Sequence, residues 1–149
     1  MTHRLLSRTE FERQVFARDG HTCVFCPAPA VDAHHILERK LFTDGGYYLD
    51  NGASVCAEHH WACETTQLSP EEVRAAAGIT QVVVPEGLSL EQAYDKWGNK
   101  VRKDGFREPG PLYFDAGCRK ALSRGGRLGH VVPEGTPLLT AEGTPDTKE

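Results

Sequence analysis

The 149-residue sequence predicts an α+β fold, for three reasons. Helix-capping signals bracket several short segments. Apolar runs of strand length lie between these segments. Cysteine and histidine residues also recur in pairs with two residues between the members, a spacing typical of metal sites that stabilise small folds. The length suffices for one domain with a modest hydrophobic core.

Helices are expected where a capping residue precedes a helical segment. The first is expected over residues 9–20, because Thr9 can cap its start and Glu12 can complete a capping box. A helix over 69–78 has the same signals, with a proline at its first position and a glycine just past its end. Helices are also predicted over 57–66 and 89–98.

Strands are predicted where apolar residues form short runs bounded by turn residues. Between the second and third of these runs lies a glycine-rich loop, residues 43–52. The first run is expected to turn through a knuckle, because two prolines follow it closely. The predicted strands are 21–26, 30–37 and 79–85.

Charge is distributed unevenly along the chain. The whole chain has a formal net charge of −4, but residues 96–127 carry nine basic and three acidic side chains. Local charge matters more than the total for a polyanionic partner. We therefore expect a core over residues 1–66, a helical and basic extension over 67–127, and a loose tail over 128–149, where Pro, Gly and Thr are frequent.

The N-terminal residues have no apolar stretch before a small-residue cleavage site, so no secretory signal is predicted. No apolar run approaches the roughly 20 residues that cross a membrane. We therefore expect a cytoplasmic protein without membrane contact. In that compartment five cysteines favour metal binding over disulfides.

Four residues have the spacing of a zinc site. Cys23 and Cys26 form a C-x2-C pair, Cys56 and His59 form a C-x2-H pair, and 29 residues separate the two pairs. Zinc prefers four sulfur or nitrogen ligands in a tetrahedron, and each pair can reach one ion from a single turn. The sequence therefore predicts structural zinc. A redox role for the C-x2-C pair, or a core without metal, is the alternative.

Cys63 is a competing ligand, because it lies four residues after His59 on the same face of the predicted helix. It could replace His59 at the zinc ion. The other interpretation is a small buried residue beside Trp61.

Two pairs of adjacent histidines are present, His34-His35 and His59-His60. Neighbours on a strand point to opposite faces, and neighbours on a helix differ by about 100°. Each pair can therefore serve two different centres. If His59 binds zinc, the other three histidines remain for a second site.

The order of these features resembles that of the HNH endonucleases, whose ββα-metal fold has a treble-clef-like zinc-knuckle frame. The resemblance covers roughly residues 11–66, less than half of the chain. It departs from the family in one zinc pair, which is Cys-x2-His where Cys-x2-Cys is commoner, so the Cys63 alternative stays open. It is carried, in order, by the segments RDGHTCVFC, AHHI, LDNGASVC and AEHH.

The resemblance implies roles for the remaining histidines. His35 matches the general base that takes a proton from the attacking water. His34 and His60 match ligands of a catalytic divalent ion, such as Mg²⁺ or Mn²⁺. Asn51 matches the asparagine whose amide helps to hold the loop and the base histidine.

A third ligand for the catalytic ion is less clear from the sequence. Glu64 lies one turn after His60 on the same helix face, so it is our candidate. A solvated helix glutamate is the alternative. Asp32 and Glu38 flank the histidine pair, but surface acids are the simpler interpretation of both.

Nucleic-acid contacts are expected from basic residues. Cations that meet phosphates supply sequence-independent affinity, and exposed aromatic rings can stack on bases. The alternative is a solvated cationic face over a core that holds the aromatic rings. For Arg18, a cation at the end of the first helix explains the residue equally well. The candidate contacts are Arg18, Arg39, Lys40, Lys100, Arg102, Lys103 and Arg107.

The sequence thus predicts a metal-dependent nuclease that hydrolyses phosphodiester bonds in DNA, with RNA as an alternative substrate. A zinc-framed nucleic-acid-binding module is the second interpretation, but a pure binder needs none of His35, Asn51 and His60. A redox protein would require a free C-x2-C pair in a βαβ context, which is missing. One site cuts one strand, so nicking and double-strand cleavage both stay open.

Overall fold

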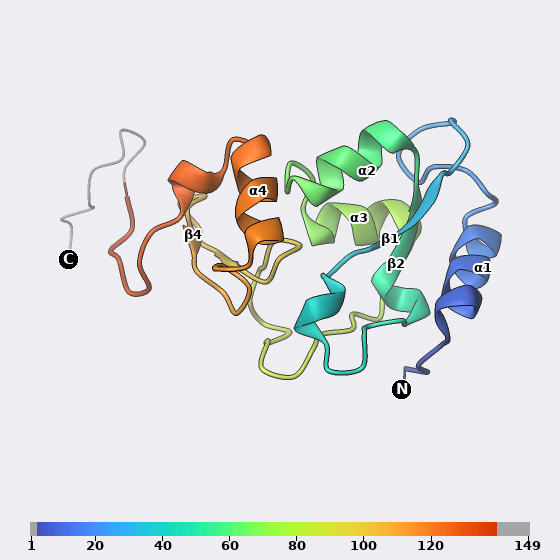
Figure 1. Ribbon diagram of the computed structural model, residues 1–149, viewed down its shortest axis with the longest axis horizontal. Helices are drawn as coiled ribbons and strands as arrows, with labels where there is room; N and C mark the ends of the chain where they lie inside the picture. The colour runs from blue at the N-terminus through green and yellow to red at the C-terminus, as the bar shows by residue number, and fades with distance from the viewer. Residues whose placement is uncertain (1–2, 140–149) are drawn as a thin grey trace.

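The computed structural model describes residues 3–139, and its α+β class confirms the prediction. Within these residues, four α-helices accompany two antiparallel sheets of two strands each. Figure 1 shows α1 and the first sheet toward one end of the molecule and α4 toward the other. In the described part of the chain, no helix has the length and apolar character needed to cross a membrane.

Helix α1 (Arg8–Arg18) begins earlier than predicted, because Ser7 and not Thr9 is its N-cap. The Ser7 hydroxyl accepts a hydrogen bond from the backbone N–H of Glu10 at 3.1 Å. Thr9 therefore lies inside the first turn. Phe11 and Val15 are buried one turn apart and form the face that packs on the first sheet.

Strands β1 (Asp32–His35) and β2 (Gly52–Val55) form that first sheet. They pair antiparallel, with His35 opposite Gly52. Gly52 allows α1 to approach closely, because a Cβ there would lie 2.6 Å from the Phe11 ring and 2.6 Å from Val15 Cγ2. A larger residue would push α1 away from the sheet. The strand predicted over 30–37 is thus confirmed in its central part.

Helices α2 (Ala57–Glu64) and α3 (Pro70–Ala77) follow β2, as predicted. Ser69 and Glu72 form a reciprocal capping box at the start of α3, and Gly78 ends it in the left-handed conformation. Because Val73 of α3 is buried in the main core cluster, that core extends beyond residue 66. The cluster comprises Cys23, Ile36, Ala53, Val55, Cys56, Cys63 and Val73.

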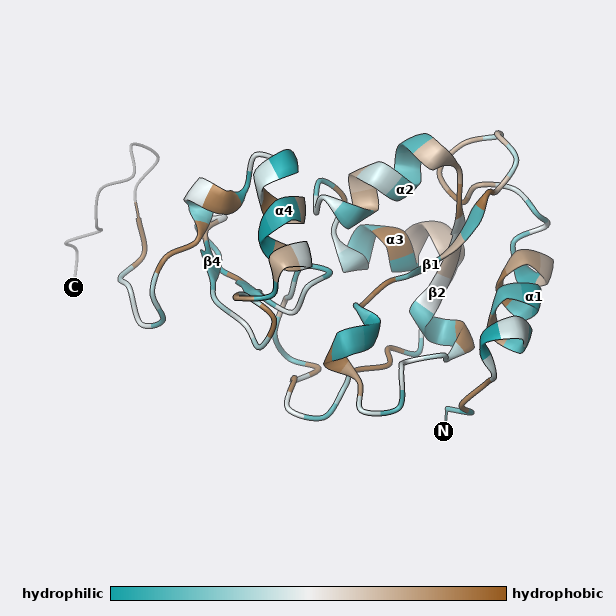
Figure 2. Cartoon of the chain, viewed as in Figure 1, coloured by the Kyte–Doolittle hydropathy of each residue, from teal (hydrophilic) through white to brown (hydrophobic). Residues whose placement is uncertain are grey.

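A hairpin and a fourth helix follow residue 98. Strands β3 (Lys100–Val101) and β4 (Arg107–Glu108) pair antiparallel, and α4 (Ala116–Arg124) is capped by Asp115. Figure 2 shows hydrophobic and hydrophilic residues alternating around α4, which buries one side. A second core cluster forms here from Trp97, Cys118, Ala121 and Leu122. Short 3-10 helices occupy Arg39–Leu41, Leu49–Asn51 and Leu128–His130.

The helix predicted over residues 89–98 is wrong, since these residues form turns and an isolated bridge. The Ser89 hydroxyl accepts from the Glu91 N–H two residues on, which closes a turn and caps no helix. The buried Asp95 carboxylate then accepts the backbone N–H groups of Trp97 and Asn99. These side-chain bonds compete with helical ones.

Two predicted strands also fail to form. Residues 79–85 have no strand partner among the described residues. Val83 is buried, Ile79 packs against the main core cluster, and Val82 and Val84 are half-buried. Residues 21–26 contribute only a bridge from Thr22 to Pro29 before the knuckle. In both segments the apolar composition reflects burial without strand pairing.

The predicted loose tail does not begin at residue 128. The Arg102 guanidinium donates to the backbone carbonyls of Thr136 and Pro137, both at 2.7 Å. The Leu139 N–H donates to the Asp104 carboxylate at 3.0 Å. Residues 128–139 are therefore attached to the β3–β4 hairpin, and the rest of the predicted tail, 140–149, lies outside the described residues.

Candidate functional site

Four side chains meet where the knuckle faces the start of α2. The ligand atoms of Cys23, Cys26, Cys56 and His59 all lie within 4.8 Å of one another. Cys26 Sγ is 3.8 Å from Cys56 Sγ, and His59 Nδ1 is 3.2 Å from Cys56 Sγ. A regular tetrahedron with zinc–sulfur bonds of about 2.3 Å has edges of roughly 3.8 Å. This Cys/His cluster could therefore hold a metal ion such as zinc.

Two of these side chains, Cys56 and His59, lie at the start of α2. Cys56 is the N-cap residue, and a hydrogen bond from the backbone N–H of His59 lowers the pKa of its thiol. A lowered pKa favours the thiolate, which is the metal-binding form. The ring of Phe25 stacks on that of His59 with centroids 5.2 Å apart, which restrains the imidazole.

Cys63 stays outside the Cys/His cluster. Its side chain is 1% exposed in the main core, and burial raises the pKa of its thiol to about 12. Because the thiolate is the metal-binding form, a thiol with so high a pKa is a poor metal ligand at neutral pH. The structure therefore favours the buried-residue interpretation of Cys63, with His59 as the fourth member of the cluster.

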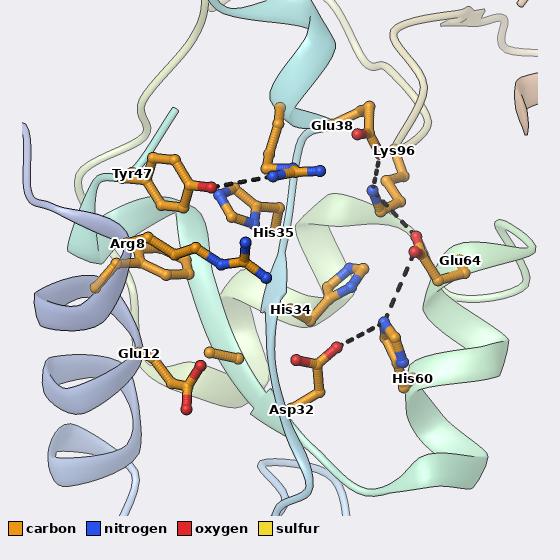
Figure 3. Close-up of a pocket in the computed structure, with 13 residues that line it drawn as sticks. Arg8, Glu12, Asp32, His34, His35, Glu38, Tyr47, His60, Glu64 and Lys96 are labelled. Carbon is orange, nitrogen blue, oxygen red and sulfur yellow. Dashed lines mark hydrogen bonds and ion pairs between the residues drawn. The ribbon is translucent and has the colours of Figure 1, made fainter. Parts of the chain in front are cut away.

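His34 and His35 lie on opposite sides of β1 (Figure 3), as expected for neighbours on a strand. The ring of His34 faces α2 and lies 5.5 Å from that of His60, centroid to centroid. The ring of His35 faces α1 and stacks on Phe11 with centroids 4.5 Å apart. The adjacent pair thus presents one histidine to each side of the same strand.

A pocket of about 230 Å³ opens around both histidines, and we call it the histidine pocket. Charged side chains of both signs from α1, β1, α2 and the segment before β3 line it (Figure 3). Its polar residues are Arg8, Glu12, Asp32, His34, His35, Glu38, Arg39, Tyr47, His60, Glu64 and Lys96.

On the α2 side of this pocket, His34, His60 and Glu64 form a second potential metal-binding group, with ligand atoms within 4.8 Å of one another. His60 Nε2 lies 3.7 Å from Glu64 Oε1 and 3.1 Å from Asp32 Oδ2. His34 is 2% exposed, and its Nδ1 has no hydrogen-bond partner within residues 3–139. An unpaired buried nitrogen costs about 1–3 kcal/mol, so a ligand there would be favourable.

His35 lies between the rings of Phe11 and Tyr47, the latter with its centroid 4.9 Å away. Its Nε2 is buried and, in the described part of the chain, has no hydrogen-bond partner. Burial and the nearby ammonium group of Lys96 lower the pKa of His35 to about 4. The imidazole is therefore neutral at neutral pH, and one of its ring nitrogens carries a lone pair.

Asn51 is fully buried and joins two segments beside the pocket. Its Oδ1 accepts from the Leu37 N–H at 3.0 Å, and its Nδ2 donates to the carbonyls of Leu37 and Gly46, both at 3.2 Å. Its own carbonyl accepts from the Ile36 N–H at 2.9 Å. Asn51 thus connects the glycine-rich loop to the backbone just after His35. It forms no hydrogen bond with the His35 ring and can position that ring only through this backbone.

Lys96 brings the extension into the histidine pocket. Its Nζ lies 2.7 Å from Glu38 Oε2 and 3.0 Å from Glu64 Oε2, and its side chain is 4% exposed. The contact with Glu38 is a hydrogen bond, whereas the contact with Glu64 is an ion pair without hydrogen-bond geometry. The Glu38 N–H also donates to the Lys96 carbonyl at 2.9 Å, so both backbone and side chain hold the two segments together.

Four of the predicted nucleic-acid contacts remain accessible to different degrees. Arg39 is exposed, lines the histidine pocket and donates to the Tyr47 hydroxyl at 3.0 Å. Lys40 is exposed although it pairs with Asp115 at 3.0 Å. Lys103 is exposed and Lys100 is half-buried on the β3–β4 hairpin. Of these four, only Arg39 lines the histidine pocket.

The other three predicted contacts are engaged inside the fold, which corrects their expected role. Arg18 donates to two backbone carbonyls around the start of β2, at 3.0 and 2.7 Å, so it fastens α1 to the sheet. Arg102 pairs with Asp104 at 2.6 Å. Arg107 pairs with Asp95 at 3.0 Å. Arg102 and Arg107 are both buried, and a cation satisfied in this way is not free to meet a phosphate.

Several pocket residues were not predicted from the sequence. Arg8 and Glu12 lie four residues apart on α1, so the helical period could have indicated that they share a face. Asp32 contacts His60 although a surface acid was the simpler expectation. Lys96 meets Glu38 across 58 positions of sequence, and no local pattern indicates such a contact.

No protein-family model, curated protein or solved structure matches this chain. Two potential metal-binding groups share helix α2, with His59 belonging to one and the adjacent His60 to the other. The second group opens into a pocket that also contains a neutral histidine.

Proposed function

We propose that this protein is a metal-dependent endonuclease of the HNH type, with β1, β2 and α2 as its ββα-metal core. The observation that supports the proposal is the arrangement on the two sides of β1. A potential metal-binding group lies on one side and the neutral His35 on the other, within one pocket. A metal-dependent hydrolase needs both a ligand set and a nearby base, whereas a binding module does not need a base.

The Cys/His cluster would hold a structural zinc ion. Its sulfur–sulfur and sulfur–nitrogen distances suit tetrahedral zinc, and all four donors come from the protein. A site filled by protein ligands leaves no position for a substrate. Its contribution is to join the knuckle to α2, which carries His60 into the histidine pocket.

The histidine pocket would hold a second divalent ion through His34, His60 and Glu64. Asp32 is a further oxygen donor beside His60. When bound, such an ion would neutralise the negative charge that develops on the phosphate oxygens. Because the set mixes imidazole and carboxylate donors, Mn²⁺ or another transition metal suits it better than Mg²⁺.

His35 would act as the general base. Its neutral ring takes a proton from water while the water oxygen bonds to phosphorus, and the bond from phosphorus to the leaving oxygen breaks. The leaving oxygen then takes a proton from solvent. Phe11 and Tyr47 hold the His35 ring from two sides, and Asn51 holds the backbone that follows it.

DNA is the proposed substrate. Arg8 and Arg39 are exposed cations that line the histidine pocket, where they can contact phosphates near the one that reacts. Contacts of this kind are insensitive to base sequence. Discrimination between DNA and RNA would have to come from other parts of the surface.

The test is cleavage of supercoiled plasmid by the purified protein with Mn²⁺ or Mg²⁺, and without added divalent ion. His35→Ala should lower the rate by about 10²- to 10⁴-fold, the range expected for loss of a general base. His130→Ala is the matched control, because His130 is exposed and does not line the pocket. Zinc content and circular dichroism would establish that each variant is folded.

One result would reject the nuclease proposal, and another would reject only the role of His35 as its base. One is wild-type protein that binds DNA but never cuts it with any divalent ion. The other is cleavage by folded His35→Ala at the wild-type rate. The first result would leave a zinc-framed nucleic-acid-binding module, and the second would assign the base to another residue.

A further inference from the structure

A second groove, of about 440 Å³, lies between α2 and α4, and we call it the α2–α4 groove. The two helices meet because Gly125, at the C-cap of α4, lets the chain pass close to the end of α2. A Cβ at Gly125 would lie 2.0 Å from the Thr65 carbonyl oxygen. The groove is therefore a consequence of the way the extension packs on the core.

An exposed aromatic ring lines this groove. Trp61, on α2, is 49% exposed, although it is large and apolar. Beside it, Trp97 is buried, and its ring N–H donates to the Glu64 carbonyl at 3.0 Å. Val31, also exposed, contributes further apolar surface. An exposed tryptophan offers a ring face on which a nucleic-acid base can stack.

The opposite wall of the groove is cationic. Lys120 and Arg124 line it from α4, one helical turn apart. Both are exposed, and neither forms an ion pair with another residue of the range 3–139. Unpaired cations that face an exposed aromatic ring are complementary to a ligand that has both a planar ring and a negative charge.

The α2–α4 groove is continuous with the histidine pocket, because His60 and Glu64 line both. Trp61 is the residue that follows His60 on α2. We propose that the α2–α4 groove binds an unpaired nucleotide next to the phosphate that is cut, with its base on Trp61 and its phosphate at Lys120 and Arg124. This inference rests on the proposed nuclease function and adds a substrate preference to it.

The nucleotide must be unpaired for a physical reason. A base inside a duplex is stacked on both faces, so Trp61 could reach its face only after the base leaves the stack. Single strands, flaps and bulges present such bases without that energetic cost. We therefore expect single-stranded or locally unpaired DNA to bind more tightly than a continuous duplex of the same sequence.

The test is binding of a short fluorescent single-stranded oligodeoxynucleotide, and of its duplex, without added divalent ion. Trp61→Ala should weaken single-strand binding by roughly 5- to 100-fold, the range for loss of one base–aromatic stack. Lys120→Ala and Arg124→Ala should each make the slope of log K against log salt less negative by about 0.7. Wild-type tryptophan emission should change on binding, and this change should disappear in Trp61→Phe, which retains buried Trp97.

Matched controls come from the same part of the chain. Phe114→Ala removes an aromatic side chain that is 81% exposed and does not line the groove. Arg119→Ala removes an exposed cation of α4 that also lies outside the groove lining. Both controls should bind the single strand as wild type does.

The outcomes separate this inference from the nuclease proposal, because binding is measured without cleavage. Binding that depends on Trp61 in a protein that never cuts would support the nucleotide site and reject the nuclease. If the wild type cuts DNA and folded Trp61→Ala binds single strands as tightly as wild type does, the nucleotide site is overturned and the nuclease proposal stands. Equal affinity for single strand and duplex would also overturn it.

Discussion

Lys96 places a positive charge where almost no water reaches it, between two carboxylates of the histidine pocket. Burial alone would raise the pKa of Glu38, but the ammonium group of Lys96 outweighs burial and holds that pKa below its ordinary value. A cation in this position keeps Glu38 ionised and restrains Glu64, which lies 3.0 Å away on α2. Lys96 therefore positions a candidate metal ligand from outside the predicted core.

Lys96→Met, which keeps the apolar stem and removes the charge, should destabilise the protein by about 3–5 kcal/mol at neutral pH. The wild-type pair stabilises the fold above the ordinary carboxyl pKa, and this contribution is lost as pH falls through the lowered pKa of Glu38. In the variant Glu38 can become neutral on acidification. The difference in melting temperature between wild type and variant should therefore shrink from pH 7 towards pH 4.

Lys100→Met is the matched control, because Lys100 is half-buried on the hairpin and forms no ion pair within residues 3–139. It should alter stability by less than about 0.5 kcal/mol. A Lys96→Met deficit that stays constant between pH 7 and pH 4 would show that packing of the stem, and not the charge, is what stabilises this contact.

For individual residues, the sequence was informative where residue type and local spacing suffice. The alternation of a strand predicted that His34 and His35 face opposite ways, which they do, although both line the histidine pocket. Spacing on a helix also predicted the proximity of His60 and Glu64. Local spacing could not predict which arginines would be buried. The guanidinium groups of Arg102 and Arg107 donate hydrogen bonds to partners that only the folded chain brings near.

Among the elements, the contact between α1 and the first sheet is controlled by one glycine. Gly52→Ala should cost about 1–3 kcal/mol, since its Cβ would overlap Phe11 and Val15 and force α1 outward. Phe11 also stacks on His35, so activity should fall together with stability. Urea denaturation measures the stability, and plasmid nicking measures the activity.

Gly129→Ala is the control for this prediction, because a Cβ there has no neighbour within 4 Å. It should be neutral or slightly stabilising. If Gly52→Ala has the same urea midpoint as wild type, α1 must pack on the sheet more loosely than expected. The expectation comes from the 2.6 Å between an added Cβ and the side chains of Phe11 and Val15.

The two predicted helices with a serine cap show what capping signals can and cannot establish. Residues 69–78 form a helix because Val73 gives it a face to bury in the main core, in addition to its caps. Residues 89–98 have similar caps, but residues 95–99 are all buried. The Asp95 carboxylate there accepts hydrogen bonds from backbone N–H groups. Caps mark where a helix can start, and tertiary burial decides whether it forms.

For the whole molecule, the zinc ion proposed for the Cys/His cluster would join the knuckle to α2, so its removal should affect more than the ligands. Cys26→Ser, or treatment with a strong zinc chelator, should abolish cooperative unfolding of the core, because apparent zinc binding energies of about 10–16 kcal/mol contribute to folding. Calorimetry and metal analysis measure this. Cys63→Ala is the control and should retain one zinc per chain, since Cys63 lies outside the cluster. Loss of zinc in Cys63→Ala would restore it as the fourth ligand.

The number of proposed catalytic groups per chain determines which DNA product the proposed nuclease should form first. The described residues contain one His34–His60–Glu64 group, and a single group can sever one strand at a time. Supercoiled plasmid should therefore become open circles first, at a rate proportional to protein concentration, and linear DNA should appear only after a lag. Gel time courses at several protein concentrations measure both quantities. Linear product that appears without the open-circle intermediate, with a rate that rises as the square of concentration, would instead show two chains acting together on one site.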